Sequence, residues 1–444
     1  MGRADRRAVA LAGVITLALA SGCSAVAGPP TRTVPTGWTQ GRVVPSRVAV
    51  GPDAWLAART SAGERLIRAR TAALAKGDVR TWLAGVAGGA LRAEQEQIFA
   101  GMRAMGAGHT RLRSMEETVR PGAAEAGVAV GWTMRATFDY RLRGFDSSPR
   151  TFTLDLSFRA DPARPAETII LTGSRPGDRP QPWDLPGLVV RRSGHTLVLA
   201  SGSETVADEI ARRAAQAGRR VAAVLGATEP AVWIAPADDA EAAQLLGRPA
   251  ADLEGIAAAV DGPIAPGRAA GADRIVLVPT AWSALTGPGR DVVMAHELTH
   301  ATTRRSSLRQ PPLWLSEGLA EFIAYRTVDL PERDLVQSAV ERLRAEGLPT
   351  DLPTSRDFES GPAGRAAAYG LSLLLARTIV EGHGTDGLVR VFRAVNGGAL
   401  VPGHGRSDAE AVTDHFLRTV LGTDRRELVA AWRSRLSRLS TERP

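Results

Sequence analysis

The chain contains 444 residues, 44% of them hydrophobic and 23% charged, and this length allows two or three folded domains. Its formal net charge is +8, yet the positive charge is almost entirely arginine, spread along the chain among acidic residues. A dispersed charge of this kind argues against a nucleic-acid partner. With a single cysteine, no disulfide framework can form within the chain.

The first residues have the pattern of a bacterial export signal. Arginines precede an apolar run over residues 8–20 that is too short to span a bilayer, and small residues then lead to Cys23 in a sequence that resembles a lipobox. We expect residues 1–22 to be a signal peptide and Cys23 to carry a lipid that holds the exported protein on the outer face of the cell membrane. The alternative is ordinary secretion, with Cys23 removed. With Cys23 lipidated, residues 23–50, rich in Pro, Gly and Thr, would be the anchor and a flexible tether.

Residues 51–200 are predicted to form an α+β accessory domain. The apolar period is helical at first and changes to two after residue 105, with Lys76-Gly77-Asp78 ending one helix and capping the next. We predict helices from about 53 to 76 and over 92–105, then strands over 127–142, 151–159, 167–172 and 188–199, the last with a turn at Gly194-His195. Helices followed by a curved antiparallel sheet, together with the turn Ala75-Lys76-Gly77-Asp78-Val79, are similar to the nuclear transport factor 2-like fold. That resemblance implies a pocket inside the sheet, and a fully packed domain is the alternative.

Residues 201–444 are predicted to form a second domain, mainly helical with a small sheet. Its expected elements are a helix over 204–225, a strand over 231–235, a helix over 238–246, a strand over 274–279, and helices over 334–346, 362–381, 385–396, 409–421 and 425–439.

The segment His296-Glu297-Leu298-Thr299-His300 has the pattern H-E-x-x-H. Residues four apart lie on one face of a helix, so both imidazoles can reach one metal ion, and Glu297 is placed beside that ion as a general base. The alternative is a solvated helix face that carries two histidines by chance. Apolar residues over 292–295 lead into the motif and argue for a buried helix.

A second motif, Trp314-Leu315-Ser316-Glu317-Gly318-Leu319-Ala320-Glu321, supplies carboxylates. One of these carboxylates can be the third ligand, because three protein ligands and one open position are typical of a catalytic zinc site. Gly318 and the W-L-x-E-G context favour Glu317. Glu321 lies four residues later on the same helical face. It is the alternative third ligand, an acceptor for a ligand imidazole, or a surface residue.

The two motifs together resemble those of the gluzincins, zinc peptidases whose third ligand is a glutamate on a second helix. W-L-x-E-G-x-A is similar to a broad group of gluzincin-like peptidases, and the resemblance covers about residues 265–385. It implies one Zn²⁺ per chain on His296, His300 and Glu317, with Glu297 as the base. It also implies that Ile275–Val278 is either the sheet edge over the zinc, which pairs with an extended substrate, or an ordinary core strand. The amine-binding segment of the related aminopeptidases is absent upstream, which favours an endopeptidase.

Zinc peptidases usually stabilise the oxyanion with the metal and one further donor, for which Tyr369 is our candidate. A core role for Tyr369 is the alternative, and Tyr325 is expected to pack. The remaining histidines are expected on the surface of the second domain or outside it: His383, His404 and His415, and His109 and His195.

We therefore predict a membrane-anchored zinc metallopeptidase that hydrolyses peptide or protein substrates outside the cell. The alternative is a non-catalytic envelope protein with a pseudo-peptidase fold and a ligand- or partner-binding N-terminal domain. A third hypothesis is a zinc hydrolase that acts on a non-peptide amide.

Overall fold

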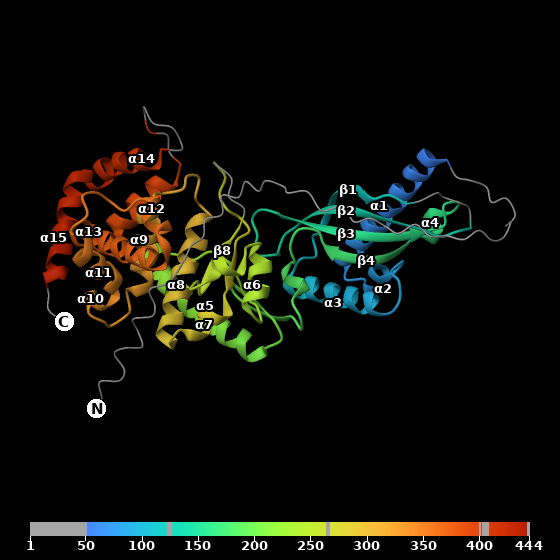
Figure 1. The fold of residues 1–444 in the computed structure, drawn as a ribbon, viewed down its shortest axis with the longest axis horizontal. Helices are drawn as coiled ribbons and strands as arrows, with labels where there is room; N and C mark the ends of the chain where they lie inside the picture. Colours follow the sequence, from blue (N-terminus) through green and yellow to red (C-terminus); the bar gives the residue numbers. More distant parts are fainter. Residues whose placement is uncertain (1–50, 122–126, 263–266, 399–400, 402–407, 442–444) are drawn as a thin grey trace.

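The computed structural model of the protein describes residues 51–121, 127–262, 267–398, 401 and 408–441 (Figure 1). The predicted signal peptide, Cys23, the tether and His404 lie outside the described residues. The fold is α+β, as predicted: helices and a first sheet are followed by a second sheet and a helical C-terminal region. Among the helices that the structure describes, none combines the length and the apolar character needed to cross a membrane.

The N-terminal unit begins with three helices, and their boundaries follow from the residues at their ends. These helices are α1 (Pro52–Lys76), α2 (Val79–Leu83) and α3 (Ala90–Met105). Gly77 ends α1 in the left-handed conformation, with φ of 78°, and the Asp78 side chain then accepts a hydrogen bond from the backbone N–H of Thr81 to cap α2. The predicted helix stop and start at Lys76-Gly77-Asp78 is confirmed.

The first sheet is antiparallel, with its strands in chain order. The strands are β1 (Arg111–Val119), β2 (Val130–Tyr140), β3 (Arg150–Ala160) and β4 (Ile170–Pro176). The sequence analysis missed β1, because most of its side chains are polar and exposed and the alternation is weak. The strand predicted over 167–172 begins too early, since residues 167 and 168 belong to the short helix α4 (Pro165–Thr168).

Aromatic side chains on one face of this sheet form the core of the N-terminal unit. Trp132 stacks on Phe158 across β2 and β3 with ring centroids 5.6 Å apart, and Phe138 stacks on Phe152 at 5.0 Å. Helices α1 to α3 pack against this face with their own apolar residues (Figure 1). The short 3-10 helix η3 (Pro182–Asp184) adds Trp183 to the same cluster.

The second sheet has the strand order β5-β6-β7-β9-β8. Its strands are β5 (Val189–Ser193), β6 (Thr196–Ala200), β7 (Ala231–Ala235), β8 (Ala258–Asp261) and β9 (Arg274–Leu277). The predicted turn at Gly194-His195 is confirmed, but the assignment of residues 188–199 to the first sheet is wrong. The β5–β6 hairpin instead pairs in parallel with β7, so the second sheet begins before residue 200.

The prediction that Ile275–Val278 forms a sheet edge is wrong, and the core-strand alternative is correct. Strand β9 lies between β7 and β8, so β8 is the edge strand, and β8 packs against helix α8 (Gly287–Arg304). The sequence analysis missed β8 because it is short and alanine-rich, and alanine has a low preference for strands.

The second sheet separates two apolar cores. On β7, Trp233 faces the core that contains α8, whereas Val232 and Ile234 face the core of the N-terminal unit. A strand buried on both faces reads as a continuous apolar run, as Ala231–Ala235 does. The helices beside this sheet are α5 (Glu204–Leu225), α6 (Asp239–Leu246) and α7 (Pro279–Ala284), with the short 3-10 helix η4 (Ala250–Leu253).

The C-terminal region consists of packed helices, as predicted. They are α9 (Leu313–Tyr325), α10 (Glu332–Leu335), α11 (Gln337–Glu346), α12 (Ser355–Glu359), α13 (Gly361–Asn396), α14 (Ala409–Phe416), η5 (Leu417–Leu421) and α15 (Arg425–Thr441). Helix α13 covers the two helices predicted over 362–381 and 385–396. Its backbone leaves the helical conformation at Gly384, with φ of 71°, between these two segments.

Buried ion pairs join the N-terminal unit to the second sheet. Asp146, in the loop after β2, accepts hydrogen bonds of 2.7 and 2.8 Å from Arg274 of β9, and the two side chains are 0% and 2% exposed. At the start of β3, Arg150 donates to Asp261 at the end of β8 at 2.5 Å. Because the charges are matched within buried pairs, the junction has a defined geometry.

Replacing Asp146 with alanine should therefore destabilise the protein strongly. Arg274 would stay buried without its carboxylate, which costs about 3–5 kcal/mol for a buried pair. Urea unfolding of Asp146→Ala should show this loss. The control is Asp155→Ala, which breaks the more exposed Arg135–Asp155 pair and should cost at most about 1 kcal/mol. Equal losses in the two variants would contradict a junction that depends on the buried pair.

Candidate metal centre

Helix α8 carries the H-E-x-x-H motif through the core. The Thr286 hydroxyl caps its first turn by accepting a hydrogen bond from the backbone N–H of Gly289 at 3.2 Å. Residues 292–301 are all buried. His296 is 0% exposed and His300 is 2% exposed, so the alternative of a solvated helix face is wrong. Both histidines lie on the same side of the helix, as their spacing requires.

Helix α9 carries the second motif and brings Glu317, 1% exposed, to the same place. Gly318 permits this arrangement, because a Cβ atom there would lie 2.6 Å from the carbonyl oxygen of Ser372 on α13. The backbones of α9 and α13 thus approach more closely at this point than any other residue allows. The glycine of the W-L-x-E-G sequence therefore has a steric role beside the neighbouring carboxylate.

Two imidazole nitrogens and one carboxylate oxygen converge in this site. His296 Nε2 lies 3.0 Å from His300 Nε2 and 3.3 Å from Glu317 Oε2, and His300 Nε2 lies 3.1 Å from the same oxygen. The three residues form a buried group that could hold a metal ion. The structure thus brings together the ligand set that the sequence predicts.

Glu321 lies on the other side of the His296 ring. Its Oε1 atom is 3.0 Å from His296 Nδ1, whereas the converging ligand atoms include His296 Nε2. Of the three alternatives for Glu321, this contact favours an acceptor for the ligand imidazole, although the two atoms are not aligned as a hydrogen bond. A carboxylate at Nδ1 favours the tautomer that leaves Nε2 free to bind a cation.

Glu297 is fully buried beside these residues. Neither of its carboxylate oxygens has a hydrogen-bond partner among the described residues. Burial raises the pKa of Glu297 to about 8, and the charges of Glu317 and Glu321 add to the effect. A buried carboxylate without a partner is costly, so the site has a strong demand for a water or an ion next to Glu297.

The electrostatics of the group favour a positive charge. Burial alone would lower the pKa of His296, but contacts with Glu317 and Glu321 outweigh burial and raise it to about 10. Burial likewise would raise the pKa of Glu317, but His300 and His296 lower it to about 2. Protons and metal ions compete for the same nitrogens. The site therefore favours a positive charge between its carboxylates, which either a proton or a metal cation can supply.

Tyr369 lies next to the centre, and Tyr325 packs in the helical core. The Tyr369 ring meets the His296 ring edge-on at 5.9 Å between centroids and also packs on Phe358 at 5.7 Å. Tyr325 is buried, and burial raises its pKa. The other described histidines lie outside the metal group, with His109 and His195 exposed and His383 and His415 half-buried.

The sequence analysis missed the residues that tie α8 to the second sheet. Arg304, in the last turn of α8, donates hydrogen bonds of 2.8 and 3.1 Å to Asp273, next to β9. A basic residue in a last helical turn is a recognisable signal, but its distant partner is not. This pair helps to fix the end of the helix that holds His300.

No family model, curated protein or solved structure matches the chain. The function of the site therefore has to follow from its own geometry.

Gly318→Ala should destabilise the protein by about 1–3 kcal/mol, because the added methyl group overlaps the α13 backbone. The substitution should also lower the affinity for a metal ion, because α9 would shift away from α13 to relieve the overlap and would carry Glu317 with it. The matched control is Gly218→Ala in α5, where the added Cβ meets open space and should stabilise the helix by about 0.4–1 kcal/mol. Thermal unfolding distinguishes these opposite signs, and an unchanged melting temperature for Gly318→Ala would contradict the steric role.

Proposed function

We propose that the protein is a zinc-dependent endopeptidase whose centre is His296, His300 and Glu317. The observation that carries this proposal is the unpartnered, buried Glu297 carboxylate beside a convergent group of metal-binding atoms. The predicted export signal and Cys23 would place the activity outside the cell, on the membrane surface. Recovery of the protein in the cytoplasm alone would contradict this location.

The donor set and its spacing support zinc. Tetrahedral zinc with nitrogen and oxygen ligands at about 2.0–2.1 Å requires ligand atoms about 3.3–3.4 Å apart. The observed separations of 3.0, 3.1 and 3.3 Å are slightly shorter than this spacing, so small outward shifts of the side chains would let the three atoms hold this ion. Two imidazoles and one carboxylate also leave a fourth position open for a water or a substrate.

The residues of the chain would divide the chemistry as follows. When bound, zinc supplies the charge that acidifies a water molecule and polarises a peptide carbonyl. Glu297 would accept a proton from the attacking water and deliver it to the amine nitrogen of the leaving peptide. Glu321 would hold the His296 ring in orientation. Tyr369 is our candidate donor to the oxyanion, on the strength of its contact with His296.

The burial of Glu297 favours an enzyme over a non-catalytic envelope protein. A structural role would be served by any side chain that fills the space, and an apolar one would avoid the cost of burying a carboxylate without a partner. Retaining such a carboxylate is useful if it accepts and donates a proton.

A substrate backbone that pairs with the second sheet next to α8 would lie against the edge strand β8.

Metal analysis of the purified full chain should find about one zinc per molecule. His296→Ala should lose it, because two remaining ligands hold zinc far more weakly than three. The control is His415→Ala, which removes a half-buried histidine outside the group and should keep the metal. A folded, zinc-supplied parent that contains no zinc would refute the proposed function.

Three glutamate variants should separate the roles in the site. Glu297→Gln keeps the shape of the side chain but removes its basicity, so the variant should bind zinc while its peptide hydrolysis falls by about 10²- to 10⁴-fold. Glu317→Gln should weaken zinc binding itself, because an anionic ligand is lost. Glu321→Gln should have a smaller effect on zinc affinity, about 10- to 100-fold at most.

The measurement is cleavage of a peptide library with and without a chelator, with zinc content determined in parallel. Glu341→Gln, an exposed change on α11, is the control and should match the parent. Equal activity of the parent and Glu297→Gln would contradict the mechanism. A zinc-loaded parent that cleaves no peptide would favour the non-catalytic alternative.

A further inference from the structure

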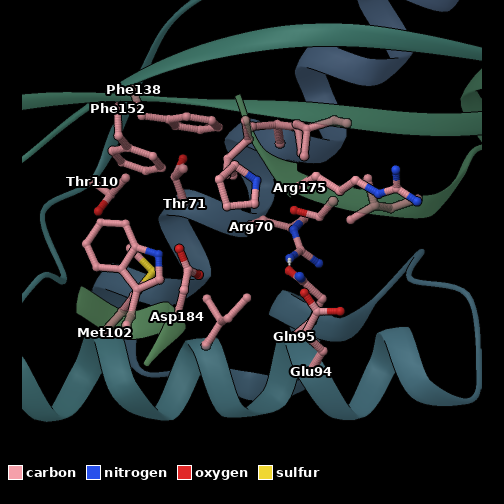
Figure 2. Close-up of a pocket in the computed structure, with 18 of the residues that line it drawn as sticks. Arg70, Thr71, Glu94, Gln95, Met102, Thr110, Phe138, Phe152, Arg175 and Asp184 are labelled. Carbon is pink, nitrogen blue, oxygen red and sulfur yellow. Dashed lines mark hydrogen bonds between the residues drawn. The ribbon is translucent and has the colours of Figure 1, made fainter. Parts of the chain in front are cut away.

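The N-terminal unit contains a pocket between its helices and the aromatic face of the first sheet (Figure 2). Helices α1 and α3 line one side, strands β2 to β4 the other, and Trp183 and Asp184 of η3 close one end. Its cavity volume is about 50 Å³. One water needs roughly 10–15 Å³, so the pocket has room for about three to five waters or for a slender ligand of similar volume.

Arg70 of α1 is a buried cation in this pocket without a carboxylate. It is 3% exposed, donates to the Trp82 carbonyl oxygen at 2.5 Å and to Gln95 Oε1 at 2.6 Å, and its guanidinium lies 4.1 Å from the Trp82 ring centroid. These partners are all neutral, and no described acidic side chain forms an ion pair with Arg70. Burial therefore lowers its pKa to about 9.

Three other buried arginines of the described chain are paired with carboxylates. Arg59, also on α1, contacts Glu117 at 2.7 Å, and the buried Arg274 and Arg150 each contact an aspartate. Burying a guanidinium is expensive unless a negative charge compensates it. The contrast with Arg59 in the same helix leaves Arg70 able to accept a negatively charged partner from outside the described chain.

Gln95 supplies a second unused donor at the same end of the pocket. Its side chain is 2% exposed, its Oε1 accepts from Arg70, and its Nε2 has no partner among the described residues. Figure 2 shows Arg70 and Gln95 joined on one side of the pocket, with Phe138, Phe152 and Met102 on the other. A guanidinium and an amide N–H side by side match the two oxygens of a carboxylate.

The acidic residues of the pocket limit the charge of its ligand. Glu94 is exposed, and Asp184, toward the apolar end, accepts a hydrogen bond from the backbone N–H of Gln181. Burial raises the pKa of Asp184 to about 6, with the charge of Glu94 adding to the effect. A second negative group near Asp184 or Glu94 would be repelled by these carboxylates. Arg175 also lines the pocket but is exposed, so the buried positive charge is that of Arg70.

We propose that this pocket binds a small monocarboxylate with a slender apolar body. Its carboxylate would accept hydrogen bonds from Arg70 and Gln95 Nε2, and its hydrocarbon part would lie against Phe138, Phe152 and Trp183. The site is separate from the metal centre and does not depend on the proposed peptidase activity.

The full chain is prepared with isotopically labelled methionine methyl groups. Hexanoate is added stepwise to about 10 mM, and NMR spectra are recorded at each step. Met102 lines the pocket, whereas Met294 lies in α8 beside the metal centre. Hexanoate should shift the Met102 signal saturably and leave Met294 unchanged. Hexanol and hexylamine, which share the hexyl chain, should bind at least about 10-fold more weakly, because they lack the carboxylate.

Variants then test the two donors. Arg70→Met and Gln95→Met should each weaken hexanoate binding at least about 10-fold, since each removes a hydrogen bond to a charged group. Arg59→Met removes a buried arginine from the same helix outside the pocket and should bind hexanoate as the parent does. If Arg70→Met does not fold, Gln95→Met and the comparison of the hexyl probes still decide. Equal binding of hexanoate and hexanol, or a shift of Met294 alone, would overturn the proposal.

Discussion

The burial of charge in the contact between α8 and α9 is the constraint on which the packing of the C-terminal helices and the second sheet depends. His296, His300 and Glu317 are all buried, and buried ionisable groups are stable only with partners. To bring those partners together, α9 must lie against both α8 and α13, which Gly318 allows. The apolar core around these helices therefore serves to hold a small polar group in a fixed geometry.

The same rule organises the junction between the two units. The second sheet is covered on both faces, and its two cores belong to different parts of the chain. Apolar packing alone leaves the relative register of such layers weakly specified. The Asp146–Arg274 pair and the Arg150–Asp261 pair add directional contacts at β9 and β8. Because β8 is the edge strand beside α8, the N-terminal unit takes part in positioning the sheet next to the metal centre.

Within the N-terminal unit, Arg70 departs from this rule. Arg59, on the same helix, forms an ion pair with Glu117, whereas Arg70 faces a pocket and donates only to neutral acceptors. The candidate metal centre and the pocket are thus of opposite sign. The metal group has an excess of carboxylate that a cation would neutralise, and the pocket has a cation that an organic anion would neutralise.

The sequence by itself determined the features that depend on local spacing. The H-E-x-x-H helix, the Glu317 helix and the Gly77 and Gly384 breaks follow from residues a few positions apart, where helical geometry dictates which side chains meet. Only the tertiary structure decided which strands pair: β1 and β8 carry weak patterns, and β5–β6 joined the second sheet. Strand pairing, the Gly318 contact and the unmatched charge of Arg70 depend on residues far apart in the chain. Their energies come from burial and from distant partners, which no local pattern records.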